Sequence, residues 1–493
     1  MAIIRKATPE YMTELEQYAK KRKDEILSCP DSCYSSENVF YISNDGSDGN
    51  DGRSPESPWL TLSHLGDDII VPGSVVHFKR GGIWRDGFTA REGVTYTAYG
   101  NGEKPRIYGS PYDAAHHGKW ELTDVPDVYV YSERIGIDVG GIFFDNASAH
   151  AVKLIPNYID GVPVFDRTYK EKFSSYKDLH RDLDFFHDFG EPVTTSEAGG
   201  LLYLCSKKGN PSERFNEIEL NLRKNVIAAR GHNITFDNIA VMYGGAHGIG
   251  AGTINGLTVK NCFIGYIGGG IQFYRDGVVT RFGNGIEIYG GCKDFTIDNC
   301  YVTECYDAGI THQLSKGGTN ECLHINVNFT NNLIDNCVYG IEYFLGRSEG
   351  DSARREMHDI FYRNNFIRNS GSGWGNERPD TDCQAAIKGW DHGNEAYNFV
   401  IENNILEYSS WNLLHNGCTL DEWGPSLKNN TFITCRNAGL ARYGANPSKQ
   451  YLFNNYTAAS PIFCDNTFVY MNSIPSDPDR YENAKLADTY QPL

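Results

Sequence analysis

Three carboxylic acids in the middle of the chain have the types and spacing that bond-cleaving chemistry needs. Glu287 and Glu342 each directly follow a Gly-Ile pair, and Asp307 lies two residues before a third such pair. Paired carboxylates suit cleavage of a glycosidic bond, because one donates a proton to the leaving oxygen while the other activates water or attacks the anomeric carbon. We predict Asp307 and Glu342 as the cleaving pair, with Glu287 as a third acid that tunes them or binds a sugar hydroxyl. In the alternative interpretation, Asp307 caps a turn and both Glu residues are solvated.

Other polar residues recur at the position that follows the Gly-Ile pair or its apolar counterpart. If the Ile side chain points inward, the next residue points outward. These outward positions are Gly250, Glu287, Thr311, Glu342, Lys388, His415 and Ala441. Stacked strands would present them about 4.8 Å apart, so they form one column. We predict that Thr311, Lys388 and His415 bind substrate beside the carboxylates.

Two long segments with Gly and charged residues, 346–358 and 372–395, interrupt the pattern. Excursions of this kind commonly wall a cleft. Trp side chains there could stack on the apolar faces of sugar rings, with core packing as the alternative. The further predicted substrate-binding residues in these segments are Trp374, Trp390, Asp391 and Arg347.

A sequence repeat predicts the elements that hold these residues. From about Asn233, a unit of the form N-I-x-I-x-N-N-x-I-x-x-C-x-x-x-G-I recurs, and its alternation of apolar and polar residues is typical of β-strands. One Asn keeps the same register in all copies: Asn238, Asn261, Asn299, Asn331, Asn364, Asn403 and Asn429. Stacked coils would bury a continuous apolar core and pass amide hydrogen bonds along the Asn row. The repeat predicts an all-β fold, a parallel β-helix with at least seven coils.

Composition and charge limit the classes of partner that the protein can bind. The 493 residues include 63 acidic and 45 basic ones, for a formal charge of -18, without a long Lys/Arg-rich run. Nucleic acids are attracted by basic surfaces, so a neutral substrate fits better. No stretch is apolar and long enough for a membrane span, and the N-terminus lacks the apolar core of a signal peptide. Most of the 13 Cys lie in the repeat, so we expect a cytoplasmic protein without a disulfide framework.

We expect five segments along the chain, because the repeat is broken between about Trp120 and Asn225. They are an N-terminal helical extension (1–37), the first part of the β-helix (38–119), an inserted β-rich subdomain flanking the cleft (120–225), the main coils with the active site (226–466) and a C-terminal tail (467–493).

The opening YISNDGSDGNDGRSPESPWLTL, the segment VHFKRGGIWR and the later coils resemble the pectin-lyase-like superfamily of carbohydrate-active enzymes. The resemblance extends from Val39 to about Asn466. It implies a right-handed parallel β-helix, and the broken region is similar to the inserted subdomain of several glycoside hydrolase branches. Lyases, hydrolases, epimerases and esterases share this scaffold, so the resemblance is more specific for the fold than for the activity.

Three functions are compatible with these features. We predict a glycoside hydrolase that acts on a neutral oligosaccharide, exo-acting because the insert and the two excursions would form deep walls. The alternative is a lyase or epimerase for uronate-containing glycans, for which Lys388 could be the base. The D-P-H-E motif of alginate epimerases and the NTD, GHG and RIK motifs of polygalacturonases are absent. A non-catalytic carbohydrate-binding solenoid is the second alternative.

We predict no cofactor. Asp45, Asp48 and Asp51 recur at every third residue, unlike the ligands of an EF-hand loop, so a solvated turn is favoured over a calcium site. His312 alternates inward and is predicted to be a satisfied interior histidine. The expected partner is an oligosaccharide, without nucleic acid or membrane, and a homo-oligomer is compatible with the sequence.

Overall fold

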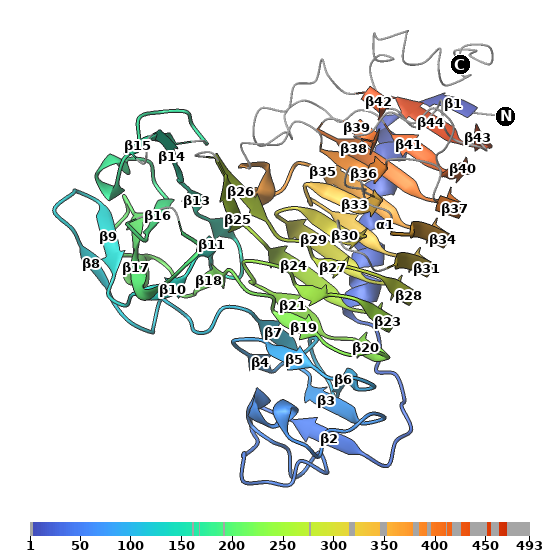
Figure 1. Cartoon of the computed structure of the whole chain (residues 1–493), viewed down its shortest axis with the longest axis horizontal. Helices are drawn as coiled ribbons and strands as arrows, with labels where there is room; N and C mark the ends of the chain where they lie inside the picture. The colour runs from blue at the N-terminus through green and yellow to red at the C-terminus, as the bar shows by residue number, and fades with distance from the viewer. Residues whose placement is uncertain are drawn as a thin grey trace.

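The chain winds into three parallel sheets that extend along the molecule, as Figure 1 shows. The computed structural model describes residues 3–159, 162–166, 168–190, 193–275, 278–314, 321–345, 353–377, 384–391, 396–410, 412–416, 425–433, 451–454 and 463–470. Each coil places successive strands in sheets B, A and C and then begins the next rung. The protein is a right-handed parallel β-helix with an inserted β-rich subdomain and a short N-terminal helix, so the predicted fold class is confirmed.

The strands of each sheet follow in spatial order. Sheet A consists of β1 (Ile3–Lys6), β44 (Thr467–Tyr470), β41 (Thr431–Ile433), β38 (Ile405–Ser409), β35 (Phe366–Ser370), β32 (Leu333–Asp335), β29 (Tyr301–Cys305), β24 (Phe263–Ile267), β21 (Ala240–Met242), β7 (Arg106–Tyr108) and β4 (Ile83–Trp84). Sheet B consists of β2 (Val39–Ile42), β3 (Val75–Lys79), β6 (Thr95–Tyr99), β20 (Ile234–Asp237), β23 (Ile254–Lys260), β28 (Cys292–Asp298), β31 (Cys322–Thr330), β34 (Arg355–Arg363), β37 (Ala396–Glu402), β40 (Ser426–Lys428) and β43 (Phe463–Cys464). Sheet C consists of β42 (Tyr451–Asn454), β39 (Asn412–Asn416), β36 (Ala385–Asp391), β33 (Tyr339–Leu345), β30 (Ala308–Gln313), β27 (Ile286–Tyr289), β22 (Ile249–Ala251), β19 (Ile227–Ala229) and β5 (Phe88–Ala90).

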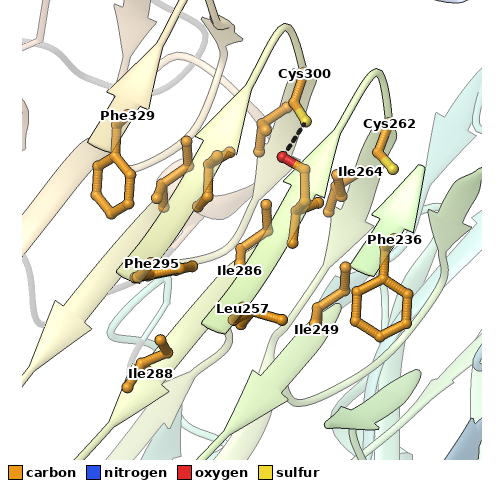
Figure 2. Close-up of a cluster of buried hydrophobic side chains, with 14 of the residues drawn as sticks. Phe236, Ile249, Leu257, Cys262, Ile264, Ile286, Ile288, Phe295, Cys300 and Phe329 are labelled. Carbon is orange, nitrogen blue, oxygen red and sulfur yellow. Dashed lines mark hydrogen bonds between the residues drawn. The ribbon is translucent and has the colours of Figure 1, made fainter. Parts of the chain in front are cut away.

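Apolar side chains stacked from rung to rung fill the interior. The close-up in Figure 2 shows Phe236, Leu257 and Phe295 among these side chains. The strand register pairs Leu257 with Phe295, and Phe295 with Val327 on the next rung. Because like positions pack on like positions, the period of the sequence repeat fixes which side chains of sheet C point outward.

The predicted row of Asn residues lies at the corner between sheets B and A. All seven, from Asn238 to Asn429, have a positive φ, between 50° and 61°. Asn tolerates this left-handed conformation better than other residues with a side chain, because its short polar group can bond locally. Asn299 Nδ2 also donates to Asn261 Oδ1 at 2.8 Å, so the predicted register is confirmed.

A second Asn row, one residue later, makes the longer amide ladder inside the β-helix. Its members are at most 1% exposed: Asn332, Asn365, Asn404, Asn430 and Asn466. From Asn332 onward, each Nδ2 donates to the Oδ1 of the next member at 2.9 to 3.1 Å. The N-N pair of the repeat therefore has two tasks, with the first Asn making the corner and the second linking the coils.

His312 is an interior histidine, as predicted, and it belongs to a hydrogen-bonded chain. Its Nδ1 lies 2.8 Å from His324 Nδ1, and its Nε2 lies 2.6 Å from the Tyr362 hydroxyl. His324 Nε2 lies 2.6 Å from the Gly290 carbonyl oxygen, which can only accept. This contact fixes the direction of every hydrogen bond in the series. His324 donates through Nε2 and accepts at Nδ1, His312 donates through Nδ1, and Tyr362 donates to His312.

The N-terminal segment returns along the β-helix as a strap. Strand β1 pairs in parallel with β44, and helix α1 (Pro9–Leu27) then follows sheet A back towards β2 (Figure 1). Leu15, Ala19 and Ile26 of α1 pack on an apolar cluster of sheet A. Its 19 residues span about 28 Å, which is close to six rungs. The structure thus corrects two predicted segments: 1–37 begins with a strand, and 467–470 belongs to sheet A, not to a tail.

The insert is a separate β-rich layer beside the main coils. Its strands are β8 (Trp120–Leu122), β9 (Val128–Tyr131), β10 (Ile135–Ile137), β11 (Val139–Phe144), β12 (Ala149–His150), β13 (Val152–Lys153), β14 (Pro156–Ile159), β15 (Val162–Asp166), β16 (Asp184–Asp188), β17 (Thr195–Cys205) and β18 (Ile218–Leu222). It leaves the coils at the corner between sheets A and C, after β7, and returns before β19. A hairpin of β25 (Gly270–Arg275) and β26 (Val278–Phe282) extends from the same corner two coils later.

The three Asp residues of the opening turn have separate protein partners. Asp45 forms an ion pair with Lys79 at 2.8 Å, Asp48 accepts from the Leu60 and Thr61 backbone, and Asp51 accepts from the Arg53 backbone. These contacts agree with the predicted turn. Among the described residues, no helix is long and apolar enough to cross a membrane.

Candidate active site on sheet C

The predicted column exists on sheet C. Gly250 pairs with Glu287, Glu287 with Thr311, and Thr311 with Glu342. Glu342 then pairs with Lys388, and Lys388 with His415. The next strand is β42, which places Asn454 opposite His415, whereas the sequence alignment had placed Ala441 there; Ala441 lies outside the described residues.

Glu342 and Lys388 form a nearly buried ion pair in this column. Lys388 Nζ lies 2.8 Å from Glu342 Oε1, and the two side chains are 9% and 8% exposed. Gln313 Nε2 donates to Glu342 Oε2 at 3.1 Å. The ammonium group also lies 3.9 Å from the centre of the Tyr339 ring. Glu342 is thus a nearly buried carboxylate whose two oxygens face Lys388 and Gln313.

Glu287 has a different basic partner, His247. His247 Nδ1 lies 2.8 Å from Glu287 Oε2, and Asn284 Nδ2 donates to the same oxygen at 2.5 Å. An unprotonated imidazole nitrogen and a carboxylate oxygen at this distance would repel each other, so the pair holds at least one proton between them. The Asn284 backbone N–H also points at His247 Nδ1, at 3.1 Å, and it can donate only when that nitrogen is unprotonated.

Competing effects set the pKa of Glu287. Burial raises it, but the charge and hydrogen bond of His247, together with the Asn284 amide, outweigh burial and leave the pKa below its ordinary value. The lowered pKa favours the ionised form of Glu287, and the proton of the pair is shared along the contact between His247 Nδ1 and Glu287 Oε2. A leaving group that develops negative charge nearby would draw this proton across through Glu287.

Asp307 lies at the corner that leads into sheet C, outside the column. It precedes β30 directly, and its backbone bonds to Gly283 and Tyr339 on the neighbouring coils. Along the strand it is four residues from Thr311, which corresponds to roughly 13 Å. The side chain is half-buried. Among the three predicted acids, Glu287 and Glu342 share a column, whereas Asp307 is displaced from both along the strand direction.

Trp374 needs a correction, because its ring has no surface open to a sugar. The residue is 1% exposed and begins a short 3-10 helix, η3 (Trp374–Glu377). Its Nε1 donates to the Glu304 carbonyl at 2.7 Å, and its ring packs against Phe143 of the insert and Tyr306. Docking of the insert on the coils covers this indole, so core packing replaces the predicted stacking.

The remaining predicted residues are placed in part. His415 is 8% exposed and lies next to Lys388. Trp390 and Asp391 are the last two residues of β36, opposite Phe344 and Leu345, and their side chains lie outside the described part of the structure. Arg347 lies outside the described residues altogether.

The sequence pattern missed several residues that contact the column. His247 and Asn284 come from turns that precede β22 and β27, and Gln313 lies two residues beyond Thr311. Tyr289, also two residues beyond its column member Glu287, is 46% exposed. The alternation of a strand could have found Gln313 and Tyr289, because positions two apart share a face. No sequence signal identifies His247 and Asn284, whose turns differ in length from coil to coil.

Metal binding has no candidate in the described ranges. No group of three or more His, Cys, Asp or Glu side chains there could hold an ion. The ten cysteines that the structure describes are all free.

Comparison with known proteins finds likeness in architecture. No protein-family model matches the chain, and no curated protein matches it by sequence. XylC, solved with xylose, is 13% identical over 89% of this chain and 87% of its own, with a TM-score of 0.43. A GH136 lacto-N-biosidase from Eubacterium ramulus is 11% identical over 94% and 71%, with a TM-score of 0.36. An alginate lyase from Paenibacillus sp. str. FPU-7 is 11% identical over 89% and 99%, with a TM-score of 0.38.

The class of protein follows from the three parallel sheets. The chain has a parallel β-helix fold, which is the architecture that the sequence resemblance to the pectin-lyase-like superfamily implied. Because many chemistries share this scaffold, the activity has to be argued from the column on sheet C.

Proposed function

We propose that the protein is a glycoside hydrolase that cleaves a neutral oligosaccharide on sheet C. The observation that carries the proposal is a pair of nearly buried carboxylates in one column, Glu287 and Glu342, each with its own basic partner. One partner supplies a proton and the other keeps a carboxylate ionised. Cleavage of a glycosidic bond needs these two states at the same time.

The two contacts suggest separate roles. Glu342, beside Lys388, is the general base that activates water. Glu287, with the proton it shares with His247, is the general acid that protonates the leaving oxygen. Asp307, first predicted in the cleaving pair, remains the alternative acid. Its displacement along the strand makes it the less favoured partner of Glu342.

The spacing supports inversion at the anomeric carbon. Glu287 and Glu342 are two rungs apart, with Thr311 on the rung between them, so their backbones lie about 10 Å apart. Carboxyl groups in inverting enzymes are about 6.5 to 9.5 Å apart, compared with about 5 to 5.5 Å in retaining enzymes. The wider gap leaves room for the attacking water. The acidic surface, with its formal charge of -18, suits a neutral substrate better than a polyanion.

A lyase for uronate-containing glycans is the second candidate. Lys388 and His415 are paired on neighbouring rungs and could provide a base and a cation for the substrate carboxylate. The ion pair with Glu342 argues against Lys388 as the base, because its amino group already has a carboxylate partner at 2.8 Å.

A substrate panel separates these candidates. Aryl glycosides of neutral sugars would report hydrolysis through release of the aryl group, and uronate polymers would report elimination through ultraviolet absorbance of unsaturated products. We expect aryl release, inverted product anomers by NMR, and loss of both in Glu342→Gln. Glu121→Gln, at an exposed position of the insert, is the matched control and should behave as wild type. Absorbance growth on uronate polymers without aryl release would replace the hydrolase proposal by the lyase.

A further inference from the structure

A cleft lies near the N-terminal end of the β-helix, three rungs from Glu287. It has a volume of about 690 Å³ and lies between residues 60–66, which include the short 3-10 helix η1 (Leu62–Gly66), and residues 83–89. Ligand sites in proteins commonly enclose about 300 to 1,000 Å³. The cleft is therefore large enough for one or two sugar rings.

Polar groups at the rim of this cleft are held in place by residues outside it. Both terminal nitrogens of Arg85 donate to the carboxylate of buried Glu219, at 2.5 and 2.6 Å. Asp86 forms an ion pair with Lys224 while its carboxylate remains largely exposed. Its φ of 76° lies in the left-handed region, which Asp and Asn tolerate better than most residues with a side chain. Arg85 and Asp86 thus offer a pre-oriented donor and acceptor.

Apolar side chains form the rest of the wall. Leu60 is 37% exposed, and Leu62 and Phe88 are half-buried beside it. A wall that combines such side chains with a fixed donor and acceptor matches the chemistry of a sugar ring. The CH groups of the ring pack on apolar surface, and its hydroxyl groups need directed hydrogen bonds.

The cleft continues the column of the candidate active site. Thr89, on its lining, pairs with Ala228, which pairs with Gly250, and Gly250 pairs with Glu287. Three rungs correspond to roughly 14 Å. The two intermediate column positions, Ala228 and Gly250, have small or no side chains of their own. The Asn225 side chain lies over Gly250, so a sugar chain that joins the two sites has to pass across this amide.

We propose that this cleft binds the distal end of the neutral oligosaccharide whose other end is cleaved at Glu287 and Glu342. The inference rests on the proposed function and adds to it a chain-length preference. A disaccharide at the carboxylates is too short to reach the cleft, whereas a longer linear chain along sheet C would occupy both sites.

The test compares substrate lengths in matched variants of the full chain. Leu60→Ala removes the exposed apolar contact, and Asp86→Asn removes the acceptor charge with a residue that tolerates a positive φ. Leu122→Ala and Asp68→Asn are the controls, at exposed positions outside the cleft. Linear xylo- and cello-oligosaccharides, from disaccharide to hexasaccharide, are the probes. The readouts are kcat/KM and calorimetric binding to a Glu342→Gln background, with circular dichroism to verify folding.

We expect wild type to gain in kcat/KM and affinity with chain length. Leu60→Ala and Asp86→Asn should each lose about tenfold for the hexasaccharide but less than about twofold for the disaccharide. Both controls should keep the gain. A wild-type protein that cleaves disaccharides without any gain for longer chains would overturn this inference alone, as would a gain that survives in both cleft variants. A wild-type protein that neither cleaves nor binds any of the neutral glycans would instead overturn the proposed function.

Discussion

Glu287 and Glu342 lie in one column of sheet C with a single residue, Thr311, paired between them. Each carboxylate has one basic side chain within 2.8 Å, His247 for the first and Lys388 for the second. The two bases differ in kind. The lysine ammonium group can only donate hydrogen bonds, whereas the histidine ring has nitrogens that can donate or accept, so the two carboxylates have partners of different chemistry.

Replacement of either carboxylate should abolish most of the activity. We expect Glu287→Gln and Glu342→Gln each to lower kcat by at least about two orders of magnitude, because a positioned acid or base commonly contributes about 10² to 10⁴. Asp307→Asn should cost less if Glu287 is the acid. Steady-state kinetics with native circular dichroism is the measurement. Near-normal turnover in both Glu variants would return these residues to a structural role, and a loss confined to Asp307→Asn and Glu342→Gln would restore the first predicted pair.

Loss of Lys388 should destabilise the protein at neutral pH. Lys388→Met leaves Glu342 nearly buried without its cation. Removal of one partner of a buried ion pair lowers the free energy of unfolding by about 3 to 5 kcal/mol. The cost should shrink at low pH, where Glu342 becomes protonated. Urea unfolding at two pH values measures both effects. Lys79→Met is the matched control, since Lys79 and Asp45 also lie 2.8 Å apart but are 45% and 81% exposed. Its expected cost is below about 1 kcal/mol, and equal costs for the two variants would contradict the prediction.

The interior histidines should make the fold sensitive to acid. Burial lowers the pKa of His324 to about 4, and burial together with His324 lowers the pKa of His312. Below pH 6.5 these histidines bind protons in the unfolded chain but stay unprotonated in the folded protein, so stability is lost as the pH falls towards 4. His324 alone contributes roughly 2 to 3 kcal/mol to this loss between pH 7 and pH 4.5.

Urea unfolding of His324→Gln tests this pH dependence. The difference in stability between pH 7 and pH 4.5 should be smaller in this variant than in wild type by that amount. His116→Gln replaces a 72% exposed histidine and should leave the difference unchanged. An unchanged difference in His324→Gln would show that the buried chain of histidines is not responsible.

The two adjacent Asn rows should respond in opposite ways to small substitutions. Asn365→Ala breaks the interior ladder and leaves buried amides unpaired, at a cost of about 1 to 3 kcal/mol. Asn364 is exposed with a φ of 56°, so Asn364→Gly should be nearly neutral, whereas Asn364→Ala should cost about 1 kcal/mol. Thermal unfolding of the three variants provides the comparison, and a costly glycine variant would show that Asn364 acts through its side chain.

Removal of divalent metal should not change turnover if the hydrolase proposal is right, because the two proposed roles need only carboxylates, His247 and Lys388. Activity before and after treatment with a chelator is the measurement. Activity that is lost and then restored by calcium would favour the lyase candidate, since calcium neutralises uronate carboxylates.

The sequence predicted the features that the period of the repeat controls. The column from Glu287 to His415 and the corner Asn row were correct, because a stacked coil gives each position a fixed direction and a fixed neighbour. The interior role of His312 followed from the same alternation. It was also possible to predict the insert, because the alternation fails between about Trp120 and Asn225.

Features that depend on contacts across coils or between layers were not predictable. Trp374 lies in an excursion whose composition suggested a cleft wall, and only the docked insert makes it part of the interior. His247 reaches Glu287 from the turn of another coil. Strand β1 has four residues and no partner nearby in the sequence, so its pairing with β44 left no local signal.

The pairing of β1 with β44 has a consequence for how the protein is made. During synthesis, residues 3–6 leave the ribosome before any coil exists, and their partners at 467–470 follow only after every rung described between them. Contacts so distant in sequence form slowly, because loop closure must precede them. Strand β1 is therefore made long before it can be placed, and until then it exposes unpaired backbone to other chains. A nascent protein of this kind is expected to benefit from a chaperone that shields this strand.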